Sequence, residues 1–241
     1  MCTVTFLPEG GKDFILTSSR DVSYEREKAS VPEICQHGGV ELLYPRDGKA
    51  GGTWIGSSSH DRLICLLNGG FQNHRRMKTY RMSRGIIVRE LLAAPEFAPA
   101  AEEIDLEGIE PFTLVVVDWK QALSLREMVW DGTEKHLRDL DPQPRIWSSS
   151  TLFTPVMQGM REDWFSSWLQ ENDPDRNNIL EFHKGAGIGD PNVDVFLRRP
   201  MVGTVSITQY WRDGGESQMR YQPFSSDQEG YEGDDHSADE R

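Results

Sequence analysis

Short runs of β-branched and aromatic residues, separated by turns rich in glycine and proline, recur along most of this chain. Runs of about four to eight such residues between turn residues predict strands. The run Phe112–Asp118 is almost entirely apolar, as expected for a strand buried on both faces. The segment between residues 20 and 39 is predicted to be a loop. The other predicted strands span residues 2–8, 13–19, 40–44, 53–56, 62–67, 123–130, 134–140, 145–149, 201–211 and 217–224.

Helical spacing of apolar residues appears in fewer places. Thr154 followed by Pro155 predicts a helix start, since threonine is a favoured N-cap and proline suits the first helical position. Ser83 predicts a similar start for a helix ending near residue 93, and further helices are predicted at 98–104 and 176–184. The apolar stripe expected to face the core after Thr154 consists of Met157, Met160, Trp164, Phe165, Trp168 and Leu169. Two groups of strands with a few helices predict a layered α+β domain.

The charge of the chain excludes two classes of partner. The formal net charge is −13, whereas nucleic acids and anionic membrane surfaces attract lysine- and arginine-rich proteins. Seven acidic residues and one arginine fall between Ser225 and Arg241. That segment has no aliphatic run, so it is predicted to be a disordered acidic tail, residues 225–241, after a single domain at 1–224.

The cysteines and the hydropathy indicate a cytoplasmic protein. Cys2, Cys35 and Cys65 are too few for a disulfide framework, and neither they nor the histidines have the spacing of a metal site. No signal peptide is visible, and the longest apolar stretch is far too short for an integral membrane segment. We expect no metal and no cofactor. The oligomeric state is left open.

Cys2 is the most informative residue for chemistry. Removal of Met1 would leave a cysteine with a free α-amine, which combines a nucleophile and a base in one residue. The amine titrates at about 7.7–8.0 and a thiol near 8.5, so the amine accepts the thiol proton near neutral pH. The alternative is a small buried hydrophobic residue in a strand, which is a common role of cysteine.

Three other segments hold candidate site residues. Arg20 and Asp21 end the second predicted strand, where a cation would lower a thiol pKa, although a surface ion pair at a turn is the alternative. Asn68, followed by two glycines, offers amide donors for an oxyanion, or forms an ordinary turn. Ser149 and Ser150 follow a predicted strand, where their hydroxyls would either line a pocket or cap the next helix.

Taken together these segments resemble the NRDE family, which includes the transport and Golgi organisation protein 2 of animals. The most specific match is the glycine-rich segment 48–56, which ends in Thr-Trp-Ile-Gly. The resemblance covers nearly the whole chain except the tail. It implies a four-layer αββα sandwich of the N-terminal nucleophile hydrolase type, similar to choloylglycine hydrolases and penicillin V acylases. It also implies Cys2 as nucleophile, Arg20 and Asp21 beside it, and Asn68 at the oxyanion.

The chain departs from that pattern in three places. The Asn-Arg-Asp-Glu motif is Ser19-Arg20-Asp21-Val22 here. The acylases have an asparagine where this chain has Ser149 or Ser150, and a late arginine where it has residues 201–203. The resemblance implies an amidohydrolase acting on a C–N bond other than a peptide bond, with a small-molecule amide as substrate. The alternative is a non-catalytic binding or carrier protein for a hydrophobic ligand such as haem or lipid, in a trafficking-related role.

Overall fold

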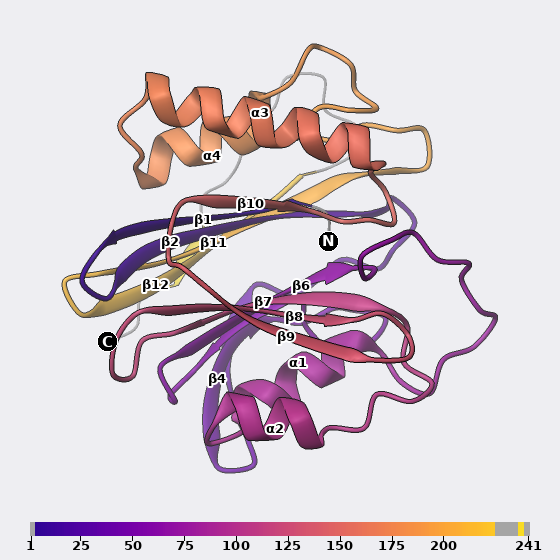
Figure 1. The fold of residues 1–241 in the computed structure, drawn as a ribbon, viewed down its shortest axis with the longest axis vertical. Coiled ribbons are helices and arrows are strands. Elements are labelled where there is room, and N and C mark those ends of the chain that lie inside the picture. Colours follow the sequence, from indigo (N-terminus) through magenta and orange to yellow (C-terminus); the bar gives the residue numbers. More distant parts are fainter. Residues whose placement is uncertain (1–2, 225–235, 239–241) are drawn as a thin grey trace. The chain divides into compact units, whose positions relative to one another are not determined.

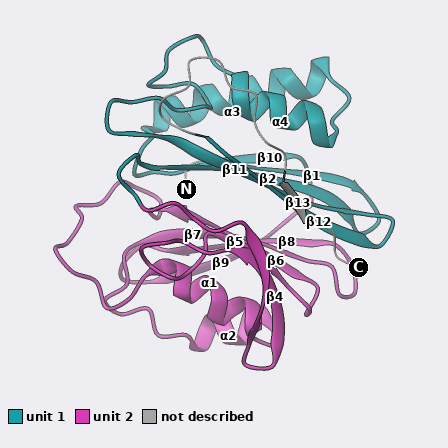
Figure 2. Cartoon of the chain, turned by 180° about the vertical axis from the view of Figure 1, so that it is seen from behind, with its two compact units in different colours: residues 1–26, 143–241 teal, residues 27–142 magenta. Residues whose placement is uncertain are grey.

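The computed structural model describes residues 3–224 and 236–238, and its elements fall into two compact units (Figure 2). Unit 1 comprises Met1–Arg26 and Gln143–Arg241, and unit 2 comprises Glu27–Pro142. Among the described residues each unit has one antiparallel sheet and two helices (Figure 1). Unit 1 is therefore built from two chain segments, and the whole of unit 2 is inserted between them.

The sheet of unit 1 places the N-terminal hairpin in its interior. The hairpin β1–β2 forms as predicted, and the later strands add on both sides of it. Most of the predicted acidic tail, residues 225–235 and 239–241, lies outside the described residues. In sheet order the strands are β10 (Arg145–Ser148), β1 (Thr3–Gly10), β2 (Asp13–Ser23), β11 (Val202–Asp213), β12 (Glu216–Pro223) and β13 (His236–Ala238).

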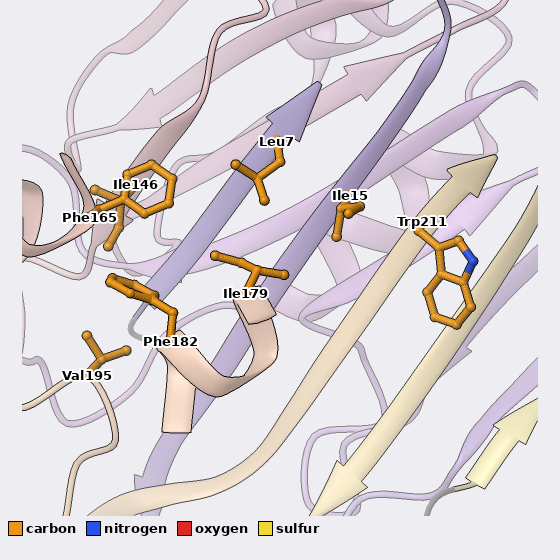
Figure 3. Packing of buried hydrophobic residues seen from close by; sticks show 8 residues of the cluster. All are labelled: Leu7, Ile15, Ile146, Phe165, Ile179, Phe182, Val195 and Trp211. Atoms are coloured by element: carbon orange, nitrogen blue, oxygen red, sulfur yellow. The ribbon is translucent and has the colours of Figure 1, made fainter. Parts of the chain in front are cut away.

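Helices α3 (Pro155–Glu171) and α4 (Arg176–Gly185) cover one face of this sheet (Figure 1). The side chain of Thr154 accepts a hydrogen bond from the backbone N–H of Met157, which confirms the predicted N-cap. Between the helices and the sheet lies an apolar cluster to which both helices and four strands contribute (Figure 3). It consists of Leu7, Ile15, Ile146, Phe165, Ile179, Phe182, Val195 and Trp211.

Unit 2 is a meander whose strands follow one another in sequence order. Helices α1 (Arg84–Ala93) and α2 (Phe97–Glu103) belong to it, and α1 packs on β4, β5 and β6. Ser83 caps α1 as predicted. The strands are β3 (Pro32–His37), β4 (Val40–Pro45), β5 (Ile55–Ser58), β6 (Arg62–Asn68), β7 (Phe112–Asp118), β8 (Ser124–Trp130) and β9 (Lys135–Leu140).

The glycine-rich segment before β5 is a packing device. A Cβ on Gly52 would lie 2.5 Å from the carbonyl carbon of Gly85, and a Cβ on Gly85 would lie 2.6 Å from the carbonyl oxygen of Thr53. The backbone N–H of Thr53 donates to the carbonyl of Gly85 at 3.2 Å. Glycine is required at both positions, because only bare backbones approach this closely. The segment holds the start of α1 against the chain that leads into β5.

Two sequence predictions are corrected by the fold. The predicted loop 20–39 contains the end of β2 and the whole of β3, because β2 stays paired with β11 as far as Ser23 and β3 pairs with β4. On α3 the buried residues are Arg161 and Phe165, while the other members of the predicted stripe are only partly buried. None of the helices within 3–224 is long and apolar enough to cross a membrane.

Candidate functional site

Two of the candidate segments, those of Arg20 and Ser149, flank the start of β1 at one end of the sheet of unit 1. Thr3, the first described residue of β1, pairs with Ser19 on β2 and with Ser148 on β10. Arg20 follows Ser19, and Ser149 follows Ser148. Since neighbouring strands are about 4.8 Å apart, the backbones of β2 and β10 are roughly 10 Å apart on either side of β1. Cys2 itself lies outside the described residues.

Asp21 is held in place by the neighbouring strand. Its carboxylate oxygen Oδ1 accepts a hydrogen bond from the hydroxyl of Thr204 at 2.6 Å. The Thr204 hydroxyl in turn accepts from the backbone N–H of Leu197 at 2.9 Å. Asp21 is 1% exposed and Arg20 is 3% exposed. These two residues are therefore buried, and the alternative of a solvated surface pair at a turn does not apply.

Arg20 acts electrostatically on a buried tyrosine. It pairs with Ser206 on β11, and Tyr221 lies on the next strand, β12. Burial raises the pKa of Tyr221, while the nearby Ser206 hydroxyl and the positive charge of Arg20 act in the opposite direction. The guanidinium therefore places positive potential at this end of the sheet, in a buried environment where charges interact strongly.

Ser149 and Ser150 begin the turn between β10 and α3. The Ser149 side chain is buried, and its hydroxyl lies 2.9 Å from that of Thr151. Its carbonyl accepts from the backbone N–H groups of Leu152 and Phe153. Ser150 is only half-buried. Ser149 thus makes bonds within the turn, while the N-cap of α3 is Thr154 rather than either serine.

Asn68 belongs to unit 2, at the end of β6. The residue after it, Gly69, has φ +87°, which explains the glycine there. The backbone N–H of Gly69 donates to the carbonyl of Pro111, and the hydroxyl of Thr113 donates to the carbonyl of Gly69. Asn68 is therefore carried by an ordered turn, half-buried, on a separate unit from Arg20 and Asp21.

The region aligned with the late arginine of the acylases offers no cation in register. A Cβ on Gly203 would lie 2.0 Å from the hydroxyl of Tyr24, so no larger side chain fits. Met201 is exposed, at 64%. The two nearby arginines point elsewhere, with Arg199 bonded to the carbonyls of Leu152 and Asn192, and Arg198 over the ring of Phe196.

A polar network that was not predicted from the sequence lies on the face of the sheet beneath the helices. The imidazole of His183 on α4 lies 2.8 Å from the hydroxyl of Thr5 and 2.8 Å from that of Ser19. Arg161 on α3 donates to the hydroxyl of Thr3 at 2.6 Å. The sequence does contain a signal for this network. Thr3 and Thr5 on β1, and Ser19 on β2, occupy positions of one strand face, which normally carries apolar residues when it is buried.

A serine hydroxyl beside an imidazole can serve as a nucleophile and its base, but the buried environment of Ser19 and His183 does not suit that role. His183 and Ser19 are both 0% exposed. Burial and the charge of Arg161 lower the pKa of His183 to about 3, which makes it a weak base at neutral pH. Within the described residues no group of histidine, cysteine or acidic side chains has the arrangement of a metal site.

Comparison with known proteins identifies related folds. A profile described as Transport and Golgi organisation 2 matches residues 1–184. A Caenorhabditis elegans N-acylethanolamine-hydrolyzing acid amidase ortholog superposes with a TM-score of 0.57 at 12% identity, covering 86% of this chain and 92% of that chain. No significant match was found among curated proteins.

Two structures of conjugated bile acid hydrolase from Clostridium perfringens are also similar. An arginine-to-leucine variant and a cysteine-to-alanine variant each superpose with a TM-score of 0.52, at 11% and 10% identity. Both comparisons cover 99% of this chain and 97% of the other. These likenesses confirm the α+β class and the N-terminal nucleophile hydrolase fold.

Proposed function

Since the chain belongs to the Transport and Golgi organisation 2 family and has the N-terminal nucleophile hydrolase fold, we propose that it is a cysteine hydrolase of a linear amide. The nucleophile is Cys2, exposed as the N-terminal residue after removal of Met1. The bond cleaved is a C–N bond other than a peptide bond. Neighbours with this fold include a protein named for hydrolysing N-acylethanolamines, which are amides of this kind.

The observation that carries the proposal is the buried pair Arg20–Asp21 beside the start of β1. Ser19 on β2 pairs with Thr3 on β1. In the sequence Arg20 follows Ser19, and Cys2 precedes Thr3. A buried arginine and aspartate stabilise a charged partner more strongly than exposed ones, because solvent screens them less. A thiolate and an α-ammonium group are the charged partners that this reaction requires.

The proposed reaction has two halves. The α-amine of Cys2 takes the thiol proton, and the thiolate attacks the amide carbonyl carbon to give a tetrahedral oxyanion. The C–N bond then breaks, the α-ammonium proton passes to the leaving nitrogen, and a thioester remains. The α-amine next takes a proton from water, hydroxide attacks the thioester, and the carboxylic acid and the free thiol are released.

The remaining candidates have supporting roles in this proposal. Arg20 lowers the thiol pKa, and Asp21 orients the α-ammonium group or Arg20. For Asn68 the family resemblance alone carries the role of amide donor to the oxyanion, because such donors act where the negative charge develops. Ser149 and Ser150 supply hydroxyl donors at the position where the acylases have asparagine.

The test is the mass of the N-terminal peptide after brief labelling with a dilute thiol probe at neutral pH. We expect Met1 to be absent and Cys2 to label much faster than Cys35 and Cys65, which serve as internal controls because one is half-buried and the other buried. Hydrolysis of an N-acyl amide should be lost in Cys2→Ala. Retained Met1, or labelling of Cys2 no faster than a free thiol, would contradict the proposal and favour a carrier of a hydrophobic ligand.

A further inference from the structure

We infer that Arg161 and His183 form a clamp that fixes the beginning of β1 against the end of β2 and so acts as a positioning device for Cys2 and Arg20. The clamp consists of these two side chains and the hydroxyls of Thr3, Thr5 and Ser19. Its effect on Cys2 rests on the proposed function. Its effect on β1 does not.

His183 bridges the two strands of the hairpin. One ring nitrogen bonds to the hydroxyl of Thr5 on β1 and the other to the hydroxyl of Ser19 on β2, each at 2.8 Å. A neutral imidazole has one donor and one acceptor nitrogen. One of the two hydroxyls therefore accepts a hydrogen bond from the ring, and the other donates one to it. With His183 on α4, three elements are fixed to one another at a single side chain.

Arg161 fixes the same region from the other helix. Its Nη1 group donates to the hydroxyl of Thr3 at 2.6 Å, and its other nitrogens donate to the carbonyls of Val193 and Asp194. The guanidinium carbon lies 3.5 Å from the centre of the ring of Phe153. Several directional bonds from a fully buried arginine leave Thr3 little freedom.

Strand alternation turns this clamp into a positioning device. Thr3, Thr5 and Ser19 point to the helix-covered face, and successive side chains of a strand point to opposite faces. Holding Ser19 on that face therefore directs Arg20 to the other face, where it influences Tyr221. A slip of one residue would exchange the two faces. Ser19 occupies the first position of the family's name motif, and its bond to His183 gives the serine a role there.

The test combines hydrogen exchange with the labelling rate of Cys2 in four full-length variants. Thr3→Val keeps the shape but removes the acceptor of Arg161, and Ser19→Ala removes one bond of His183. Thr3→Ser keeps the hydroxyl and should restore wild-type behaviour. Thr208→Val is the matched control, because Thr208 is a buried β11 residue of the same sheet, and among the described residues its hydroxyl has no hydrogen-bond partner.

We expect Thr3→Val and Ser19→Ala to speed amide exchange in residues 3–7 by about tenfold, the factor for one lost buried hydrogen bond. Unit 2 peptides should exchange as in the wild type, as should all peptides of Thr3→Ser and Thr208→Val. Cys2 labelling should slow, and its pH profile should shift, in the first two variants only. Exchange that does not change, or that changes equally in Thr208→Val, overturns the clamp.

The two readouts separate the possible failures. If wild-type Cys2 is no more reactive than Cys35, the proposed function fails, and the exchange data alone decide the clamp. If Cys2 is reactive and the exchange of β1 rises without any change in its labelling rate or pH profile, the clamp holds β1 but has no positioning role. A slower Cys2 with unchanged exchange would also contradict the inference.

Discussion

In unit 2 α1 packs on the sheet mainly through apolar residues, and one buried arginine of β6, Arg62, donates to the carbonyls of Leu91 and Ala94 at its end. In unit 1 the face beneath α3 and α4 changes from apolar to mainly polar along the strands. α1 buries Ile87, Val88, Leu91 and Leu92, and its start packs on the backbone of Gly52. In unit 1 the row Leu7–Ile15–Trp211 is followed by Thr5–Thr17–Gln209 and then by Thr3–Ser19–Ile207, in which only the β11 residue is apolar.

The difference separates two ways of attaching a helix to a sheet. Apolar packing is non-directional and mainly stabilises, so it tolerates changes that conserve volume. Buried hydrogen bonds stabilise less on balance but fix orientation, and they are costly when half-broken. Unit 1 concentrates such bonds at the end of the sheet that begins at Thr3, where the proposed reaction needs precise placement. In unit 2 the corresponding bonds come from Arg62 alone among the contacts of α1 described above.

The largest effect in this comparison is expected for Arg161→Met. Methionine fills most of the volume but leaves the hydroxyl of Thr3 and the carbonyls of Val193 and Asp194 without their donor. Losing several buried charge-assisted hydrogen bonds should lower the free energy of unfolding by about 4 kcal/mol. Urea unfolding of the wild type and of the variant measures this difference in the free energy of unfolding. A loss of unfolding free energy under about 1 kcal/mol would show that the polar end of unit 1 is no more sensitive to substitution than an apolar interface.

The next largest effect is a loss of stability in acid that originates in unit 1. The pKa of His183 is lowered to about 3 by burial and by Arg161, so the unfolded chain binds the proton more tightly than the folded one. Its contribution is present above the unfolded pKa of about 6.5 and is lost as pH falls toward 3, on the order of 3 kcal/mol by pH 4.

Comparison with His183→Gln isolates that contribution. Glutamine has both a donor and an acceptor but does not titrate in this range, so the variant should show a flatter decline of stability between pH 6.5 and 4. Thermal unfolding measured across that range gives both curves. Parallel curves for the wild type and the variant would mean that His183 does not resist protonation in the folded protein.

The smallest of these effects tests unit 2. Gly85→Ala would place a Cβ 2.6 Å from the carbonyl oxygen of Thr53, so the start of α1 must move away. Overpacking of this kind costs about 2 kcal/mol, reduced by the better helix propensity of alanine. The loss should be independent of pH, in contrast to the loss through His183. Gly159→Ala, in α3 with open space around its Cβ position, is the control and should be neutral or stabilising.

The sequence predicted the elements that depend on local patterns. The hairpin β1–β2, the caps at Ser83 and Thr154, and the buried strand β7 follow from turn residues, cap residues and apolar runs. These features are predictable because each is decided within a few neighbouring residues.

The clamp was not predicted because it depends on contacts between distant residues. Arg161 is separated from Thr3 by 158 positions, and His183 from Thr5 by 178. Charged side chains are normally exposed, so an arginine at helical spacing between Met157 and Phe165 was not recognised as core. β3 was missed since its pattern is weak, with Ile34 53% exposed.

The order of the strands has a consequence for synthesis on the ribosome. The hairpin β1–β2 emerges before its sheet neighbours β10 and β11, which follow only after the whole of unit 2. At about 5–20 residues per second the hairpin waits on the order of ten seconds for them. During that interval the hydroxyls of Thr3, Thr5, Thr17 and Ser19 keep one end of a face wettable. The same side chains that later bind Arg161, His183 and Gln209 are thus hydrated while the strand pair awaits its neighbours.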